Sequence, residues 1–396
     1  MVSRTAPADR SPPSASSRVE MHLNSILMHA IEGRASDIHL EPFEQGIRVR
    51  ERKDGRLYDA PSPPMDCAEG VVSRLKILAK LDIAERRLPQ DGQCTHPTSA
   101  SNPAVDLRVS TLPTTHGEKV VIRILDGANM PLDLTQLGFT EPQLEMLHQT
   151  LTQSQGLILN SGPTGSGKTL TLYSCLNHLM ATHLNVSTIE DPCEIELVGA
   201  NQVSIHDRIG LTFDSALRAL MRQDPDVIMI GEIRDNSTAE MAIKAAQTGH
   251  LVLSSIHTND APSTLARLIY MGVPGFHVGS SLTLVCAQRL LRRLCLHCRT
   301  RTSPPTQVQD QFPHENWHSP QGCDRCLGGY SGRIGVFEMM PITAELHEAL
   351  LLRPDVLRFT DIARRQGTLS LRDAGLALAA EGLTSWEEVI SQTPGP

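Results

Sequence analysis

The segment GPTGSGKT, residues 162–169, constrains the fold of this chain more than any other feature of its sequence. It satisfies the pattern GxxxxGK[ST] completely, with apolar Leu157–Leu159 before it and the helix-compatible stretch Leu170–Tyr173 after it. A strand, glycine-rich loop and helix in this order let backbone N–H groups surround a phosphate at the positive end of the helix dipole. The loop residues expected to contact a nucleotide are Gly162, Pro163, Thr164, Gly165, Ser166, Gly167, Lys168 and Thr169.

Two residues of this loop carry the expected nucleotide chemistry. Lys168 is expected to reach the β- and γ-phosphates of ATP, and the Thr169 hydroxyl is expected to bind Mg²⁺. Hydrolysis also needs a group that orients the attacking water. Glu232 follows the apolar run Val227–Ile230, and Gly231 occupies the position where many P-loop enzymes place a metal-binding aspartate. The sequence therefore predicts Glu232 as the base, as a partner of the metal through water, or as both.

Length and charge narrow the classes of function. The 396 residues exceed what one compact core usually holds, so two or three domains are expected. A net charge of −8 and an aromatic content of 3% argue against direct binding of nucleic acid. No apolar run approaches the ~20 residues that span a bilayer, and the N-terminus lacks the apolar segment of a secretory signal. A cytoplasmic protein is predicted, which meets a membrane only through partners.

Residue patterning divides the chain into regions. Apolar residues recur at helical spacing over 19–31, and the alternating segment 46–52, followed by Lys53-Asp54-Gly55, predicts a β-hairpin. Later apolar runs that end in polar residues alternate with helical segments, which is typical of a parallel sheet. The predicted regions are a disordered tail 1–18, an N-terminal α+β domain 19–125, a linker 126–142, a P-loop domain 143–294, a cysteine-containing subdomain 295–335 and a helical C-terminal region 336–396.

Four of the nine cysteines form two CxxC pairs, Cys295/Cys298 and Cys323/Cys326. Two such pairs can present four thiolates as a closed tetrahedral site, which is the pattern of structural zinc. Four soft ligands without a free position argue against a catalytic metal. A redox-active pair is the alternative, although a single CxxC would suffice for that role. The sequence therefore predicts that Zn²⁺ binds the subdomain 295–335.

Seven segments follow one another in an order that resembles one known family. They are ASDIHLEP, RRLPQDGQ, LRVSTLPTTHGEKVVIRIL, GPTGSGKT, STIEDPCE, RQDPDVIMIGEIRD and TGHLVLSSIHTND. Together they resemble the type II secretion and type IV pilus assembly ATPases, the GspE/PilB group, over about residues 19–391. The resemblance implies an α/β chain in which a small PAS-like α+β domain precedes a RecA-like P-loop ATPase domain. It also implies a zinc-binding insertion and a helical C-terminal tail.

The resemblance also implies roles for acidic residues and a histidine. Glu190, Asp191 and Glu194 match an acidic box near the nucleotide, and Glu194 is the second choice for the base after Glu232. Acids near bound Mg²⁺ make independent chemical sense, since the cation and the attacking water need oxygen partners. His257 ends a predicted buried strand, where it could contact the γ-phosphate. A lone histidine in such a place would more often be structural.

Four arginines are the expected sources of positive charge at the nucleotide. By resemblance, Arg108 and Arg123 of the N-terminal domain supply charge to the γ-phosphate. Strand alternation directs Arg108 away from the apolar side of its strand. Surface ion pairing is the alternative, and the residues alone favour it. Arg218 and Arg222 lie four residues apart on one predicted helix face, and they are candidates for the nucleotide cleft or a subunit interface.

The family resemblance implies a hexamer in which nucleotide lies between the two domains. The expected partners are inner-membrane platform and docking proteins, and only they would bring the chain to the inner membrane. Family members typically carry an additional N-terminal docking domain, where this chain has its Ser/Pro tail, so docking through the remaining N-terminal domain is expected. The leading interpretation is a motor that assembles a pseudopilus for type II secretion. The alternatives are a type IV pilus or DNA-uptake motor and a nucleotide-binding scaffold that does not hydrolyse ATP.

Overall fold

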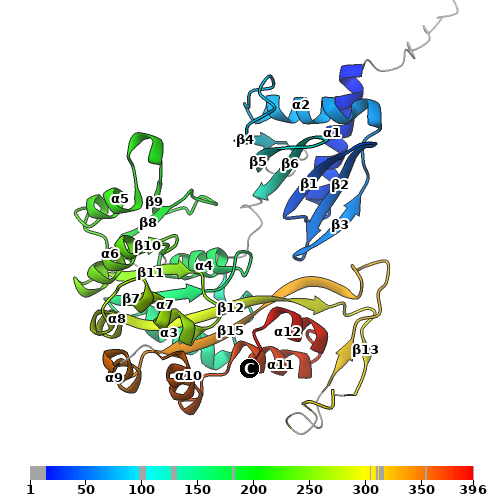
Figure 1. Cartoon of the computed structure of the whole chain (residues 1–396). Coiled ribbons are helices and arrows are strands. Elements are labelled where there is room, and N and C mark those ends of the chain that lie inside the picture. Colours follow the sequence, from blue (N-terminus) through cyan, green and yellow to red (C-terminus); the bar gives the residue numbers. More distant parts are fainter. Residues whose placement is uncertain are drawn as a thin grey trace, which may run out of the picture. The chain divides into compact units, whose positions relative to one another are not determined.

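The computed structural model describes residues 15–97, 104–125, 132–180, 183–303, 305–308, 311, 316–352 and 355–395. The chain forms two compact units, which meet in the sequence between Asn129 and Met130 (Figure 1). The first unit is an antiparallel sheet with helices, and the second is a mostly parallel sheet with helices on both faces. None of the described helices combines the length and the apolar character needed to cross a membrane.

Unit 1 contains one six-stranded antiparallel sheet with the strand order β3-β2-β1-β6-β5-β4. Its strands are β1 (Asp37–Phe43), β2 (Gly46–Lys53), β3 (Arg56–Ala60), β4 (Gln90–His96), β5 (Val105–Thr114) and β6 (Gly117–Leu125). Its helices are α1 (Ala15–Glu32), the short η1 (Met65–Cys67) and α2 (Ala68–Leu78).

One face of this sheet forms the core of unit 1. Ile38 and Leu40 of β1 are fully buried with Leu27 of α1 and Leu75 of α2. The predicted hairpin is confirmed, because β2 and β3 pair across a turn at Asp54 and Gly55. The predicted disordered tail 1–18 is wrong for residues 15–18, which already belong to α1, and residues 1–14 lie outside the described part.

Unit 2 is built on a seven-stranded sheet with the order β15-β12-β7-β11-β10-β8-β9, in which only β15 is antiparallel. The strands are β7 (Gly156–Ser161), β8 (Val186–Glu190), β9 (Asn201–Ser204), β10 (Val227–Ile230), β11 (Leu251–Ile256), β12 (Leu282–Leu294) and β15 (Tyr330–Pro341). The accompanying helices are η3 (Leu134–Gln136), α3 (Glu141–Leu151), α4 (Lys168–Met180), η4 (Asp207–Ile209), α5 (Phe213–Leu220), α6 (Asn236–Gln247), α7 (Ala261–Tyr270) and α8 (Gly275–Ser281).

The sheet of unit 2 is buried on both faces, as its continuous apolar strands require. In β7, Leu157 and Leu159 contribute to one apolar cluster, and Ile158 between them contributes to the other. Helices α3 and α4 pack on the Ile158 side, and α5 to α8 pack on the opposite side. The P-loop domain is therefore a three-layer α/β structure, as the sequence predicts.

The predicted linker 126–142 extends too far toward the C-terminus. Leu134 and Leu137 are buried in the same apolar cluster as α3 and α4. The N–H of Gly335 in β15 also donates to the carbonyl of Leu137, at 2.9 Å. Residues 132–142 thus belong to unit 2, and the rest of the predicted linker, 126–131, lies outside the described residues.

The boundary predicted at residue 335 divides a strand. Strands β12 and β15 form a long antiparallel hairpin whose register runs from Leu284↔Pro341 to Leu294↔Tyr330. The cysteine-containing segment lies at the tip of this hairpin and includes the short strands β13 (Thr300–Arg301) and β14 (His318–Ser319). The sequence pattern could not show this pairing, because its two partners are separated by the whole segment.

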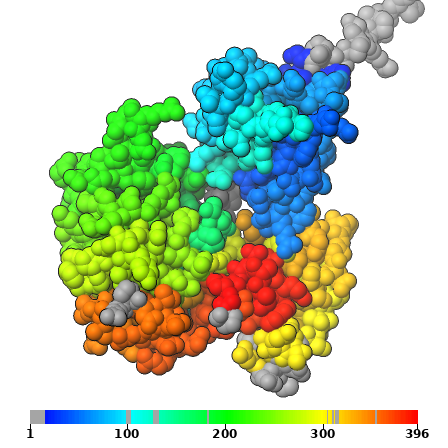
Figure 2. Space-filling view, viewed as in Figure 1, coloured from blue at the N-terminus to red at the C-terminus, as the bar shows by residue number. Residues whose placement is uncertain are grey.

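The helical C-terminal region is confirmed and packs within unit 2. It consists of α9 (Ala344–Leu352), α10 (Val356–Arg365), α11 (Leu371–Ala380) and α12 (Trp386–Gln392), coloured orange to red in Figure 2. Phe359, Leu376 and Val389 are buried in the same cluster as the sheet. The buried pair Arg292–Glu388, with 2.6 Å between Nη2 and Oε2, attaches α12 to β12.

Candidate nucleotide site

The P-loop leaves the sheet at the carboxyl end of β7 and enters α4 at Lys168. Gly165 and Gly167 have φ values of +80° and +91°, a backbone conformation that side chains with a Cβ rarely adopt. The loop therefore turns where the sequence pattern predicts. The N–H of Gly162 donates to the carbonyl of Ile256, the last residue of β11, at 3.2 Å. This bond joins the loop to the neighbouring strand.

Lys168 is folded back onto its own loop. Its Nζ donates to the carbonyls of Gly162 at 2.6 Å and Pro163 at 3.0 Å, and the residue is 9% exposed. Burial lowers the pKa of Lys168 to about 8, with the nearby Arg289 acting in the same direction and Glu232 opposing both. A nucleotide phosphate would supply negative charge directly at this buried ammonium. The neighbouring Thr169 is exposed.

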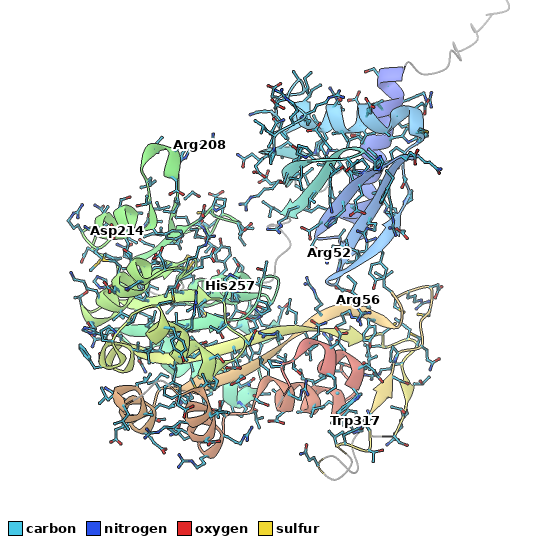
Figure 3. All side chains as sticks on the ribbon, in the orientation of Figure 1. Arg52, Arg56, Arg208, Asp214, His257 and Trp317 are labelled. Carbon is cyan, nitrogen blue, oxygen red and sulfur yellow. The ribbon has the colours of Figure 1, made fainter. Side chains whose placement is uncertain are left out.

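Two further predicted residues meet at the same edge of the sheet. Glu232 follows β10 and His257 follows β11, and β11 lies between β7 and β10 in the sheet. His257 Nε2 lies 3.3 Å from Glu232 Oε2, and Figure 3 labels His257 at this edge. We call this edge, formed by the P-loop, Glu232 and His257, the nucleotide edge.

Arg234 also belongs to the nucleotide edge, although sequence reasoning did not select it. Its guanidinium contacts Glu232, and its Nη1 lies 3.2 Å from Asp191 Oδ2. Burial alone would raise the pKa of Glu232, but Arg234 and His257 hold that pKa below its ordinary value. The available signal was the spacing, since Arg234 stands only two positions after the predicted base.

The predicted acidic box is divided between the interior and the surface. Glu190, at the end of β8, is 4% exposed; it accepts from Thr188 Oγ1 at 2.6 Å and from Gln202 Nε2 at 3.2 Å, and also contacts the hydroxyl of Tyr173. Burial, followed by the contact with Glu190, raises the pKa of Tyr173. Asp191 is instead exposed and faces Arg234. Nucleotide binding by Glu190 stays a prediction, while the geometry gives it a role in packing.

Glu194, the second candidate for the base, lies in the loop after β8. Its backbone N–H donates to the hydroxyl of Tyr173 at 3.2 Å, and the residue is half-buried. The contact with Tyr173 places the start of this loop beside α4. Glu232 is therefore the predicted acid that the structure brings into direct contact with His257 and Arg234.

The four predicted arginines lie on two different surfaces. Arg108 and Arg123 are directly opposite each other on β5 and β6 in unit 1, and Arg123 Nε lies 3.3 Å from Asp37 Oδ1. On α5 of unit 2, Arg218 pairs with Asp214 at 3.0 Å, and Arg222 donates to the carbonyl of Arg218. Figure 3 labels Asp214 on this helix. Contact of any of the four with nucleotide stays a prediction.

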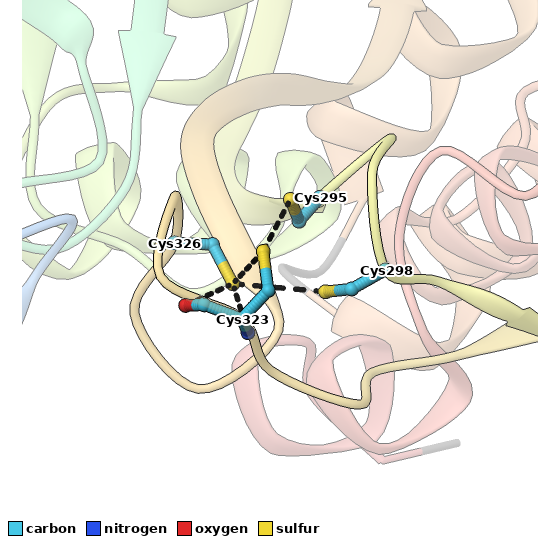
Figure 4. A group of neighbouring side chains, drawn as sticks. All are labelled: Cys295, Cys298, Cys323 and Cys326. Carbon is cyan, nitrogen blue, oxygen red and sulfur yellow. Dashed lines mark hydrogen bonds between the residues drawn. The ribbon is translucent and has the colours of Figure 1, made fainter.

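The four predicted zinc ligands gather at the tip of the β12–β15 hairpin (Figure 4), and we call them the four-cysteine cluster. The Sγ atoms lie 3.9 Å apart for Cys295 and Cys323, and 3.7 Å apart for Cys298 and Cys326 and for Cys323 and Cys326. Zn–S bonds of about 2.3 Å in a tetrahedron place sulfurs about 3.8 Å apart. The cluster therefore fits Zn²⁺, and the distances exceed the ~2 Å of a disulfide.

Comparison with known proteins gives relatives along almost the whole chain. Residues 14–391 match the family described as "Type II/IV secretion system protein". The chain is 48% identical over 374 residues to the type IV pilus assembly ATPase PilB of Pseudomonas aeruginosa, covering 93% of this chain and 66% of that protein. It is also 48% identical to the HofB homolog of Escherichia coli over 93% of this chain and 80% of that protein. It is 43% identical to the type II secretion system protein E of Pectobacterium carotovorum, over 94% of this chain and 75% of that protein. The chain thus spans about two thirds of the length of the PilB relative.

Solved structures have the same fold. The ATPase DotB of Legionella pneumophila matches with a TM-score of 0.70 at 19% identity, over 96% of this chain and 97% of that one. The pilus retraction motor PilT with bound ADP matches with a TM-score of 0.64 at 24% identity, over 94% of this chain and 97% of that one. These likenesses confirm the predicted α/β ATPase fold.

Proposed function

Because the chain belongs to the type II/IV secretion system protein family, we propose that it is a Mg²⁺-dependent ATP hydrolase that powers the assembly of a pilin-like fibre. It acts as a hexamer on the cytoplasmic side of the inner membrane, where platform and docking proteins of the fibre machine hold it. The four-cysteine cluster binds a structural Zn²⁺ in this proposal. The relatives named PilB and type II secretion protein E support it.

One observation carries the enzymatic part of the proposal. Glu232 and His257 lie 3.3 Å apart at the ends of the two strands that follow β7 in the sheet, so both face the edge where the P-loop begins. A phosphate chain held by the P-loop would have a lysine at its β/γ end and a carboxylate beside it. A scaffold that only bound nucleotide would not need that carboxylate.

The residues of the nucleotide edge then divide the work. The P-loop amides and Lys168 would hold the phosphates. The Thr169 hydroxyl would ligate Mg²⁺, and that ion would neutralise charge on the β- and γ-phosphates. Glu232 orients the attacking water and accepts its proton. Its pKa lies below the ordinary value, so the carboxylate is ionised at neutral pH. His257 and Arg234 hold this carboxylate in place.

Identity favours a type IV pilus as the assembled fibre. The chain is 48%, 47%, 45% and 40% identical to four PilB proteins, and 43%, 42% and 42% identical to three type II secretion E proteins. Because three of these four PilB values exceed every type II value, we place pilus assembly before the type II secretion that the sequence alone favoured. Type II secretion is the second candidate, because those relatives also match over 94% of this chain.

A genetic experiment tests the proposed function. The gene would be deleted in the organism that makes this chain and restored as the wild type, as Lys168→Ala, or as the control Lys244→Ala. Lys244 is exposed on α6, outside the nucleotide edge. Loss of surface fibres that the wild type and the control restore and Lys168→Ala does not restore supports pilus assembly. Intact fibres with retained exoproteins would support type II secretion instead, and unaffected fibres and secretion would refute both.

A further inference from the structure

Strand β12 continues past the point where β7 ends. Their parallel register runs from Leu282↔Leu157 to Ala287↔Ser161, and Ser161 is the last residue of β7. The chain of β7 then turns into the P-loop, while β12 runs on to Leu294. Gln288 is therefore the first β12 residue beyond the shared ladder, directly beside the beginning of the loop.

The P-loop packs closely on Gln288 at both of its ends. A Cβ added to Gly162 would lie 2.7 Å from the carbonyl oxygen of Gln288, and one added to Gly167 would lie 2.8 Å from its Nε2. At Gly162 the atom met belongs to the backbone, so only glycine allows this approach. At Gly167 it ends a side chain that can move, and there the φ of +91° is what favours glycine. The first and the last glycine of the loop thus both rest on the same β12 residue.

The side chain of Gln288 also joins the two elements that flank the P-loop. Its Oε1 accepts from Asn160 Nδ2 at the end of β7 and from Thr171 Oγ1 in the first turn of α4, each at 2.9 Å. Gln288 and Asn160 are 2% exposed, and Thr171 is 4% exposed. Water therefore cannot easily replace these bonds, and loss of the acceptor would leave two buried donors without it.

The backbone of Gln288 extends the connection to the loop after β11. Its carbonyl accepts from Nη1 of Arg289 at 2.9 Å, and Nη2 of the same guanidinium donates to the carbonyl of Asn259 at 2.6 Å. Asn259 stands two residues after His257. Gln288 is thus in contact with both ends of the P-loop. Through Arg289 it is also connected to the segment that carries His257.

We infer that Gln288 is a positioning residue for the nucleotide phosphates. It fixes the start of the P-loop, its last glycine and the first turn of α4 in one arrangement, and so directs the loop amides, Lys168 and Thr169 toward the β- and γ-phosphates. It acts through the loop and does not touch the nucleotide. The inference rests on the proposed function only in taking ATP and ADP as the ligands of this loop.

The test compares a near-isosteric change at Gln288 with the same change elsewhere. Gln288→Met keeps the size of the side chain and removes the acceptor for Asn160 and Thr171. Gln143→Met is the control, because Gln143 of α3 donates its Nε2 to the carbonyl of Phe337, the β15 residue that pairs with Gln288. Equilibrium titration with fluorescent ADP, thermal unfolding and, where turnover occurs, KM and kcat for ATP are measured on the full chain.

We expect Gln288→Met to weaken ADP affinity about tenfold at a temperature far below unfolding, with KM for ATP rising more than kcat falls. Gln143→Met should lower thermal stability and leave ADP affinity unchanged. Thr171→Val breaks the same contact from α4, so its effect on ADP affinity should be smaller and non-additive with that of Gln288→Met. It also keeps the test open should Gln288→Met not fold.

Two results would overturn the inference. One is wild-type ADP affinity in both Gln288→Met and Thr171→Val, and the other is an additive effect of the two substitutions. These outcomes are distinct from a failure of the proposed function, because ADP binding requires no hydrolysis. A wild-type protein that binds ADP and does not hydrolyse ATP would refute the proposed activity, and the role of Gln288 would still be decided by the affinities.

Discussion

The nucleotide edge and the four-cysteine cluster belong to the same unit and are built in opposite ways. At the nucleotide edge, charged groups are satisfied by their neighbours: Lys168 contacts loop carbonyls, and Glu232 contacts Arg234 and His257. The four cysteines instead present identical soft atoms at distances that already fit a tetrahedron. A ligand must displace contacts at the first site, whereas a metal completes the second without rearrangement.

From this difference in construction we infer which property of the protein each site controls. A phosphate bound by the P-loop would take Lys168 away from its carbonyl partners, so nucleotide binding would change local contacts. The four-cysteine cluster joins the two ends of the segment that interrupts the β12–β15 hairpin, so a bound metal would stabilise a local fold. Changes at the first site should therefore alter turnover and affinity, and changes at the second should alter stability.

Apart from loss of Lys168, the largest expected effect is at Glu232. Glu232→Gln keeps the size of the side chain and removes the charge that orients water and accepts its proton, so ATP hydrolysis should fall by roughly 10²–10⁴-fold. ATP binding should persist, because the P-loop contacts are unchanged. Hydrolysis and equilibrium binding are measured together, with the exposed Glu240→Gln of α6 as control. Normal turnover in Glu232→Gln would transfer the role of base to another acid, with Glu194 next.

At the four-cysteine cluster the comparison predicts loss of stability without loss of affinity. Cys323→Ser removes one of four thiolates and should lower the unfolding temperature by at least about 5 °C, with little change in nucleotide affinity. Elemental analysis should find close to one zinc per wild-type chain. The control is Cys94→Ser, the same change at a half-buried cysteine outside the cluster. Metal-free wild-type protein, or a Cys295–Cys298 disulfide, would contradict the zinc assignment.

Arg108 and Arg123 test whether the nucleotide edge is complete within unit 2. If they supply charge to the γ-phosphate, Arg108→Ala or Arg123→Ala should reduce hydrolysis about 10–100-fold and leave ADP affinity nearly unchanged. Lysine should restore activity only in part, because it lacks the planar fork of arginine. Arg48→Ala removes an exposed arginine of the same sheet, paired with Asp59, and serves as control. Near-normal rates in both variants would identify the two arginines as surface residues and make Arg218 and Arg222 the next candidates.

The smallest expected effect is a pH dependence of nucleotide affinity. Burial lowers the pKa of Lys168 to about 8 in the ligand-free protein, so its ammonium is charged below pH 8 and neutral above it. Because phosphate binding favours the charged form, ADP affinity should be level below pH 8 and fall by up to about tenfold per pH unit above it. ADP titrations between pH 7 and 9.5 measure this slope. A flat profile, or the same slope in Lys168→Ala, would exclude Lys168 as its origin.

The sequence predicts the two sites well where neighbouring residues define them. The P-loop, the acid after β10 and the CxxC pairs are local patterns, and each lies where its pattern indicates. Arg234 stands two positions after Glu232, but its second partner is distant in the sequence, and so are the side-chain partners of Gln288. Asp191 lies 43 residues before Arg234, and Asn160 lies 128 residues before Gln288. Such contacts arise only when the strand order of the sheet is known.

The same physical reason explains the errors in the region boundaries. The pairing of β12 with β15 crosses the whole cysteine-containing segment, so no local pattern could assign residues 330–335 to the main sheet. Leu134 and Leu137 read as part of a linker because proline and glycine surround them, although the core of unit 2 buries both. The buried position of Glu190 likewise depends on Tyr173 and Gln202 from other elements.

The central claim is that the nucleotide edge hydrolyses ATP, and release of phosphate from ATP by the purified full chain tests it most directly. The wild type and the exposed-lysine control Lys244→Ala should release phosphate in a Mg²⁺-dependent manner. Lys168→Ala should lose this activity, because the β- and γ-phosphates lose their charged partner. Equal Mg²⁺-dependent rates in Lys168→Ala and the wild type would contradict the account, since the P-loop would then play no part in the reaction.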